Sequence, residues 1–126
     1  SGFNCGVATF DLRFKKPNSG DYITPKALHT IEHLLATVLR NSEKKDDIVY
    51  FGPMGCRTGF YLLTLRLSFN EVLSLLKESI KTALTLEEVP GSKREECGNY
   101  LEHDLAAAKE ELTNYLHILD GVEAHS

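Results

Sequence analysis

An α+β fold with a mostly antiparallel sheet and helices packed on one face is what the sequence predicts. Segments with the alternation or composition of strands lie in the first half of the chain, interrupted by one helical segment, and two more helical segments follow them. Strands that are close in sequence usually pair with each other, and the helices then cover one side of the sheet. The expected element order is βαββαα, in a single domain over residues 1–126.

The first half of the chain supplies the predicted strands and the first helix. Residues 7–14 alternate apolar and polar side chains, which is the period of a half-buried strand. Thr24 followed by a proline predicts a helix start, and apolar residues recur with helical spacing as far as about Arg40. Residues 48–54 and 57–67 are apolar and β-rich with a glycine-bearing bend between them, so we expect a hairpin.

The second half is predicted to be mainly helical. Ser68, with a glutamate three positions later, resembles a capping box for a helix over residues 71–84. A last helix is expected over about residues 98–119, after a loop. Residues 85–89 are a candidate for one further short strand.

Composition and charge exclude several classes of protein. The chain has 126 residues, 42% of them hydrophobic, which suffices for one compact core but not for two domains. The net charge of -4 is spread over interleaved acidic and basic residues, so neither nucleic acid nor an anionic membrane is a favoured partner. Apolar runs fall far short of the roughly 20 residues that cross a bilayer. We therefore expect a soluble protein.

The three cysteines, Cys5, Cys56 and Cys97, are too few and too uneven in number for a disulfide framework. Free thiols in a reducing compartment are the simpler interpretation, which predicts a cytoplasmic location.

The stretch "HTIEH" suggests a metal site on the first helix. His29 and His33 are four residues apart, so they lie on one helix face and can reach one ion about 2.0–2.1 Å from each nitrogen. Glu32 would then lie beside an open coordination position, where a carboxylate can act as a base. The alternative is that these are polar residues of a helix surface, because so short a pattern also occurs by chance.

Two cysteines are candidates for the same chemistry. Cys97 comes before a predicted helix start, where backbone N–H groups favour the thiolate that binds metal. Cys56 lies in the glycine-rich stretch "GPMGCRTGF", with Arg57 beside it as a stabiliser of a proton-transferring thiolate. A small buried thiol is the alternative interpretation for each.

Four segments in order, "DLRFKKPN", "HTIEHLLATVLRN", "YFGPMGCRTGFYL" and "ECGNYLEHDL", resemble the S-ribosylhomocysteine lyases, the LuxS family. The resemblance extends from Asp11 into the last helix and implies a fold of the LuxS/MPP-like metallohydrolase type. It also implies that His29, His33 and Cys97 hold one divalent metal per subunit. Fe(II) is the expected ion, with zinc or cobalt as substitutes in the isolated protein.

The resemblance further implies a reaction and the residues that perform it. Family members cleave S-ribosylhomocysteine to homocysteine and 4,5-dihydroxy-2,3-pentanedione. The second product is the precursor of autoinducer-2 in quorum sensing, and the first belongs to the methionine cycle. These enzymes move a carbonyl along the ribose and then eliminate the thioether. Glu32 and Cys56 match the two proton carriers, and Arg13 matches an arginine that helps to fix the substrate.

The family also implies a homodimer with active sites at the subunit interface. Its N-terminal "S-F-x-x-D-H-T" stretch, which contributes to substrate binding, is absent before "SGFNCGV". We expect either that such a segment precedes Ser1 in the natural chain, or that metal binding survives while substrate affinity falls. Two other hypotheses follow from the residues: a degenerate homologue that binds metal without lyase activity, and a metallopeptidase of the HxxEH type.

Overall fold

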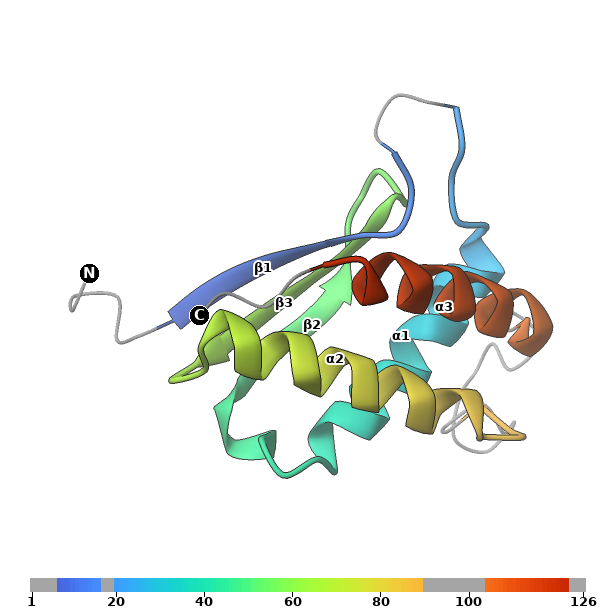
Figure 1. The fold of residues 1–126 in the computed structure, drawn as a ribbon. Coiled ribbons are helices and arrows are strands. Elements are labelled where there is room, and N and C mark those ends of the chain that lie inside the picture. Colours follow the sequence, from blue (N-terminus) through green and yellow to red (C-terminus); the bar gives the residue numbers. More distant parts are fainter. Residues whose placement is uncertain (1–6, 17–19, 90–103, 123–126) are drawn as a thin grey trace.

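The computed structural model describes residues 7–16, 20–89 and 104–122. Its elements follow the predicted order βαββαα, and a short 3-10 helix precedes the second strand (Figure 1). Their bounds are β1 Val7–Arg13, α1 Pro25–Arg40, the 3-10 helix Lys45–Asp47, β2 Ile48–Pro53, β3 Gly59–Leu65, α2 Phe69–Leu84 and α3 Leu105–Asp120.

The sheet has three strands in the order β1-β3-β2, and both pairings are antiparallel. The predicted hairpin between β2 and β3 is therefore confirmed. In the register, Leu62 at the centre of β3 pairs with Phe10 of β1 on one side and with Phe51 of β2 on the other. Because all three side chains lie on the same face, they form a continuous apolar surface across the sheet.

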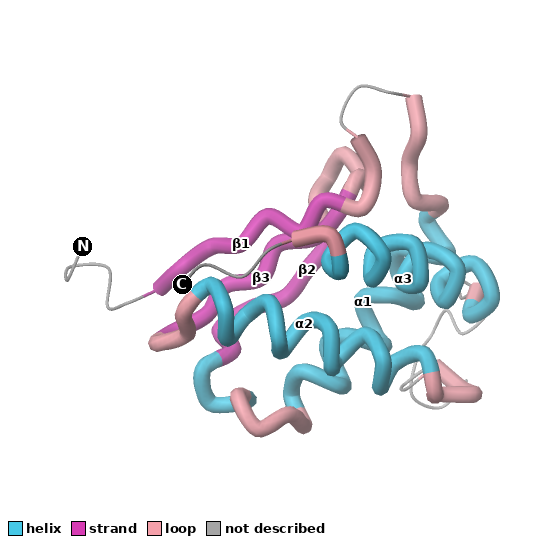
Figure 2. Tube along the Cα trace, in the orientation of Figure 1, coloured by secondary structure: helices cyan, strands magenta, loops and turns pink. Residues whose placement is uncertain are grey.

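The helices cover one face of this sheet (Figure 2). Leu12, Phe60 and Leu62 point into the core and pack with buried helix residues. Thr9 and Tyr61 alternate with them along the same strands and are exposed. This alternation confirms the predicted α+β class with an antiparallel sheet.

Helix α1 begins as its sequence predicts. The Thr24 side chain accepts a hydrogen bond from the backbone N–H of Ala27 at 3.3 Å, and Pro25 occupies the first turn. The apolar residues with helical spacing in the sequence are Leu28, Ile31, Leu35 and Val38. Ile31 and Leu35 are fully buried, whereas Leu28 and Val38 are only partly buried. The buried residues of α1 are Ala27, Thr30, Ile31, Leu34, Leu35 and Leu39.

The other two helices complete the core. The predicted capping box of α2 is present, with Ser68 Oγ accepting from the Glu71 backbone N–H and the Glu71 carboxylate accepting from the Ser68 backbone N–H. Ile80 of α2 and Leu112 of α3 are fully buried in the same hydrophobic core cluster as the buried residues of α1. None of the helices in the described ranges is long and apolar enough to span a membrane.

Two predictions about the second half are wrong. Helix α3 begins at Leu105 and not near Gly98, because Asp104 has extended backbone angles and accepts a hydrogen bond from Ala107 as the N-cap. Residues 85–89 form no strand. Thr85 ends α2 instead, where its N–H donates to the carbonyl of Thr82 at 3.0 Å.

Candidate functional site

The two histidines of α1 face each other. Their Nε2 atoms are 3.0 Å apart, and the rings meet edge to face with centroids 4.6 Å apart. Both side chains are half-buried, as is that of Glu32, which directly precedes His33. Helical spacing alone produces this approach, because residues four apart are neighbours on a helix surface.

Helix α3 starts against the same turn of α1. The backbone N–H of Asp104 donates to the buried hydroxyl of Thr30 at 2.8 Å, and that hydroxyl in turn donates to the Lys26 carbonyl at 2.7 Å. Thr30 directly follows His29 in the chain. Asp104, the N-cap of α3, therefore contacts the residue that follows His29.

The proposed third ligand, Cys97, lies outside the described residues, as does Cys5. Within the ranges that the structure describes, no cluster of three or more His, Cys, Asp or Glu side chains is placed to hold a metal. The pair of His29 and His33 is the part of the predicted metal site that the structure describes.

The turn between β2 and β3 carries Cys56, the other predicted catalytic residue besides Glu32. The N–H of Arg57 donates to the carbonyl of Met54 at 3.0 Å, and the N–H of Met54 donates to the carbonyl of Gly59 at 2.9 Å. Arg57 has a φ of 59°, a left-handed conformation that a non-glycine residue seldom adopts. This tight turn holds Cys56 as an exposed free thiol.

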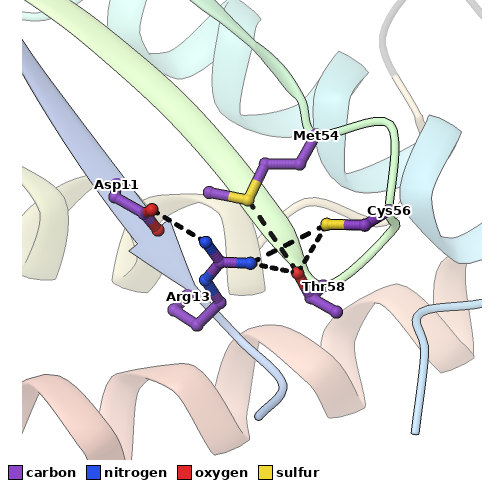
Figure 3. A network of polar contacts seen from close by, with 5 residues as sticks. All are labelled: Asp11, Arg13, Met54, Cys56 and Thr58. Carbon is purple, nitrogen blue, oxygen red and sulfur yellow. Dashed lines mark hydrogen bonds and ion pairs between the residues drawn. The ribbon is translucent and has the colours of Figure 1, made fainter. Parts of the chain in front are cut away.

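Cys56 takes part in a network of polar contacts that reaches β1 (Figure 3). Its Sγ atom lies 2.9 Å from Thr58 Oγ1 and 3.7 Å from Arg13 Nη1. Arg13 Nη1 also donates to Thr58 Oγ1, while Arg13 Nη2 forms an ion pair with Asp11 at 2.8 Å. The guanidinium thus bridges a carboxylate and a thiol.

These contacts favour the charged form of the thiol. The pKa of Cys56 lies below its ordinary value, chiefly because the side chain of Thr58 and then its backbone hydrogen-bond the sulfur; Arg13 adds a smaller effect in the same direction. Asp11 is the main reason that the pKa of Arg13 is raised. A thiolate is the reactive form of cysteine, so the geometry suits a group that accepts and returns a proton.

Strand pairing places Arg13 at this turn. Arg13 pairs with Gly59 in the register of β1 and β3. A Cβ at Gly59 would lie 2.0 Å from the carbonyl oxygen of Leu12, so only glycine permits this approach. Beyond the strand, the N–H groups of Phe14 and Lys15 both donate to the carbonyl of Thr58 at 2.9 Å.

The same turn also contacts the segment before α1. The N–H of Ile23 donates to the carbonyl of Arg57 at 2.9 Å, directly before the Thr24 cap. The turn at residues 54–59, which carries Cys56 (the thiol turn), and the start of α1, which carries His29 and His33 (the histidine helix), are therefore held together by a backbone hydrogen bond.

The predicted stabiliser of Cys56 is replaced by another arginine. The side chain of Arg57 lies over the ring of Tyr22, with its Cζ atom 5.6 Å from the ring centroid, and Arg13 contacts the sulfur instead. Sequence reasoning also missed Asp11 and Thr58. Asp11 could have been found, because residues two apart on a strand share a face.

Comparison with known proteins places nearly the whole chain in one family. The model of the family described as S-Ribosylhomocysteinase (LuxS) matches residues 2–125. The chain belongs to the LuxS family. The match spans all six predicted site residues, including Cys97.

Individual relatives agree with the family match. An S-ribosylhomocysteine lyase of Phocaeicola vulgatus is 50% identical over 114 residues, covering 88% of this chain and 71% of the relative. One of Borreliella afzelii is 45% identical over 123 residues, covering 95% of this chain and 78% of the relative. One of Porphyromonas gingivalis is 46% identical over 114 residues, covering 87% and 71%.

Proposed function

We propose that this protein is an S-ribosylhomocysteine lyase, which cleaves S-ribosylhomocysteine to homocysteine and 4,5-dihydroxy-2,3-pentanedione. The observation that carries the proposal is the thiol network of Cys56, Arg13 and Thr58, tied through Ile23 to the helix of His29 and His33, in a chain of the LuxS family. The relatives in this family bear the name of that lyase.

The histidine pair fits a divalent metal. Two nitrogens that bind one ion at about 2.0–2.1 Å in tetrahedral geometry are about 3.3 Å apart, close to the 3.0 Å between the two Nε2 atoms. We propose Cys97 as the third ligand, supported by the contact of Thr30 with Asp104, which follows Cys97 by seven positions in the sequence. Fe(II) is the expected ion, with zinc or cobalt as substitutes.

When bound, such an ion supplies a Lewis acid that stabilises negative charge developing on the sugar oxygens. The side chains supply proton transfer. Moving a carbonyl by one carbon requires that a proton leave the neighbouring carbon and return to the former carbonyl carbon. Elimination then removes a proton beside the final carbonyl as the C–S bond breaks and homocysteine leaves. We assign these transfers to Glu32 and Cys56.

Arg13 is proposed to act in two ways. Its guanidinium lies 3.7 Å from the Cys56 sulfur, where a fixed positive charge favours the thiolate. The same group is partly exposed at the end of β1, where its remaining N–H donors can bind a sugar hydroxyl. Asp11 holds the guanidinium in this orientation through the 2.8 Å ion pair.

We also propose that the protein is a homodimer in the cytoplasm, with the exposed sheet face at the subunit interface. Tyr50 and Tyr61 are exposed on this face, together with Val7 at the start of β1. Aromatic residues of this kind are enriched in interfaces. Asp11 and Arg13 lie on the same face, so a second subunit covering it would lie beside the thiol network.

The test is a thiol-release assay on Fe(II)-loaded protein under anaerobic conditions, with S-ribosylhomocysteine as substrate. We expect wild-type protein to release homocysteine, and both Glu32→Gln and Cys56→Ala to lose nearly all activity while still binding metal. Unchanged rates in both metal-loaded variants would contradict the assigned roles. Hydrolysis of peptides without thioether cleavage would favour the metallopeptidase hypothesis.

A further inference from the structure

Thr58 lies at the centre of the thiol network, the polar contacts among Asp11, Arg13, Met54, Cys56 and Thr58. The residue is 1% exposed, and among the described residues its hydroxyl oxygen contacts three groups: Cys56 Sγ at 2.9 Å, Met54 Sδ at 3.9 Å and Arg13 Nη1 (Figure 3). The family resemblance assigned no role to this residue.

The donors and acceptors around this hydroxyl determine where its hydrogen points. A hydroxyl has one hydrogen to donate, whereas a guanidinium can only donate. Arg13 therefore uses a lone pair of Thr58 Oγ1, and the single hydrogen is left for one of the two sulfur atoms. The sulfur of Cys56 is 1.0 Å nearer than that of Met54, the difference between 3.9 and 2.9 Å. A thiolate also accepts more strongly than a thioether.

We propose that Thr58 is a positioning residue of the lyase reaction, whose hydroxyl donates a hydrogen bond to the Cys56 thiolate and holds the sulfur beside Arg13. This inference rests on the proposed function for its catalytic meaning. The oxygen links the two groups directly, accepting from the guanidinium and donating to the sulfur. Without this oxygen, the guanidinium and the sulfur are linked to each other only by their 3.7 Å contact.

The backbone of Thr58 is fixed in place for this role. Its carbonyl accepts from the N–H groups of both Phe14 and Lys15 at 2.9 Å, so the end of β1 clamps it. On the other side, Arg57 in its left-handed conformation bends the chain between Cys56 and Thr58. The hydroxyl is consequently held by the turn itself and does not depend on substrate for its position.

The charged groups around Cys56 agree with this assignment. Arg13 approaches the sulfur from β1 with Asp11 behind it, while the guanidinium of Arg57 lies over Tyr22. Thr58 is the largest cause of the lowered pKa of Cys56, ahead of Arg13. Because this pKa is lowered, the thiolate persists to lower pH than in an ordinary cysteine and is lost as pH falls through the lowered value.

The experiment measures the pH dependence of the alkylation rate at Cys56 and does not measure turnover. Metal-loaded protein is treated with iodoacetamide over a pH series, and the rate at Cys56 is read from its peptide by mass spectrometry, which separates it from Cys5 and Cys97. In Thr58→Val we expect the midpoint of the rate profile to rise by about one pH unit, since a hydrogen bond to a charged group contributes about this much. Thr58→Ser keeps the hydroxyl and is expected to keep the wild-type midpoint.

Met54→Leu is the matched control, because Met54 is also buried and contacts the hydroxyl but does not donate to Cys56. Its midpoint is expected to stay at the wild-type value, and a rise equal to that of Thr58→Val would assign the effect to packing. Thr58→Ala replaces Thr58→Val if the latter does not fold. An unchanged midpoint in the folded hydroxyl-deleted variant overturns the proposal.

The thiol-release assay on the same samples separates this proposal from the proposed function. If the midpoint rises in Thr58→Val but the wild-type protein has no lyase activity, the result would support the hydrogen bond and contradict the proposed function. Lyase activity in the wild type, with a midpoint that does not move in Thr58→Val, would support the function and contradict the role of Thr58.

Discussion

The two parts of the site differ in how the sequence builds them. His29 and His33 approach within 3.0 Å because a single helix presents residues four apart on one face. Cys56, Thr58 and Arg13 approach because a left-handed turn and the pairing of β1 with β3 bring distant segments together. The first part depends on local geometry alone, whereas the second depends on the complete sheet.

This difference predicts how each part responds to change. Variants on the helix should remove the metal ligand they alter and leave the thiol network intact. Variants in the strands should alter the thiol without removing metal. Four substitutions test the separation, from the largest expected effect to the smallest.

The largest effect is expected in His29→Ala. Removing one ring leaves the ion with fewer ligands, and we expect metal affinity and lyase activity to fall by about 100-fold or more, since even outer-shell changes cost about 10- to 100-fold. Metal content after dialysis and thiol release measure the two losses. His117→Ala is the matched control, because His117 is an exposed histidine of α3. Equal metal content in both variants would contradict the assignment of His29.

Thr30→Val should come next, because it removes the hydrogen bond that holds the start of α3 against α1. The Asp104 N–H then loses its partner, and we expect the free energy of unfolding to fall by about 1–2 kcal/mol. Urea denaturation measures this free energy of unfolding. Thr82→Val is the matched control, since the Thr82 hydroxyl makes the same bond to the carbonyl four residues earlier, at an exposed position, and links to no other element in the described part of the chain. Equal losses in the two variants would show that the contact between α1 and α3 contributes nothing.

Arg13→Gln removes the positive charge beside Cys56 and should affect the thiol less than Thr58→Val does. Because Arg13 lowers the pKa of Cys56, its loss raises the pH at which the thiolate forms. The alkylation rate at neutral pH should therefore fall several-fold, with metal content unchanged. A faster rate would contradict the sign of this interaction.

The smallest effect is expected in Asp11→Asn. The ion pair with Arg13 is half-exposed, and such pairs contribute about 0–1 kcal/mol, which corresponds to at most about a fivefold change in kcat/KM. Asp46→Asn, at an exposed position of the 3-10 helix, is the control. A loss as large as that of Cys56→Ala would mean that Asp11 itself transfers protons.

The sequence predicts those features that depend on local rules. The start of α1 at Thr24 and the capping box at Ser68 were predicted from spacing and are present. The start of α3 was missed although Asp104 is a favourable N-cap residue, because the helical pattern was extended back to the glycine at position 98. A strand at residues 85–89 was expected from their composition, but the N–H groups of Thr85 and Leu86 donate to the last turn of α2 and no strand follows in those residues.

The thiol network shows where local reasoning ends. Arg57 was expected to stabilise Cys56 because it is adjacent in sequence, whereas the turn directs its side chain over Tyr22. Arg13 was assigned to substrate from the family resemblance, and its contact with the sulfur depends on the register of β1 against β3. No spacing rule connects residues that meet only through strand pairing.

The most direct test of this account is X-ray absorption spectroscopy of the zinc-loaded protein, its Cys97→Ser variant and its Cys56→Ser variant. We predict nitrogen scatterers and one sulfur at about 2.3 Å from the ion in the wild type. The sulfur should disappear in Cys97→Ser and persist in Cys56→Ser, because the histidine helix and the thiol turn have separate tasks. Loss of the sulfur in Cys56→Ser, or its retention in Cys97→Ser, would contradict that separation.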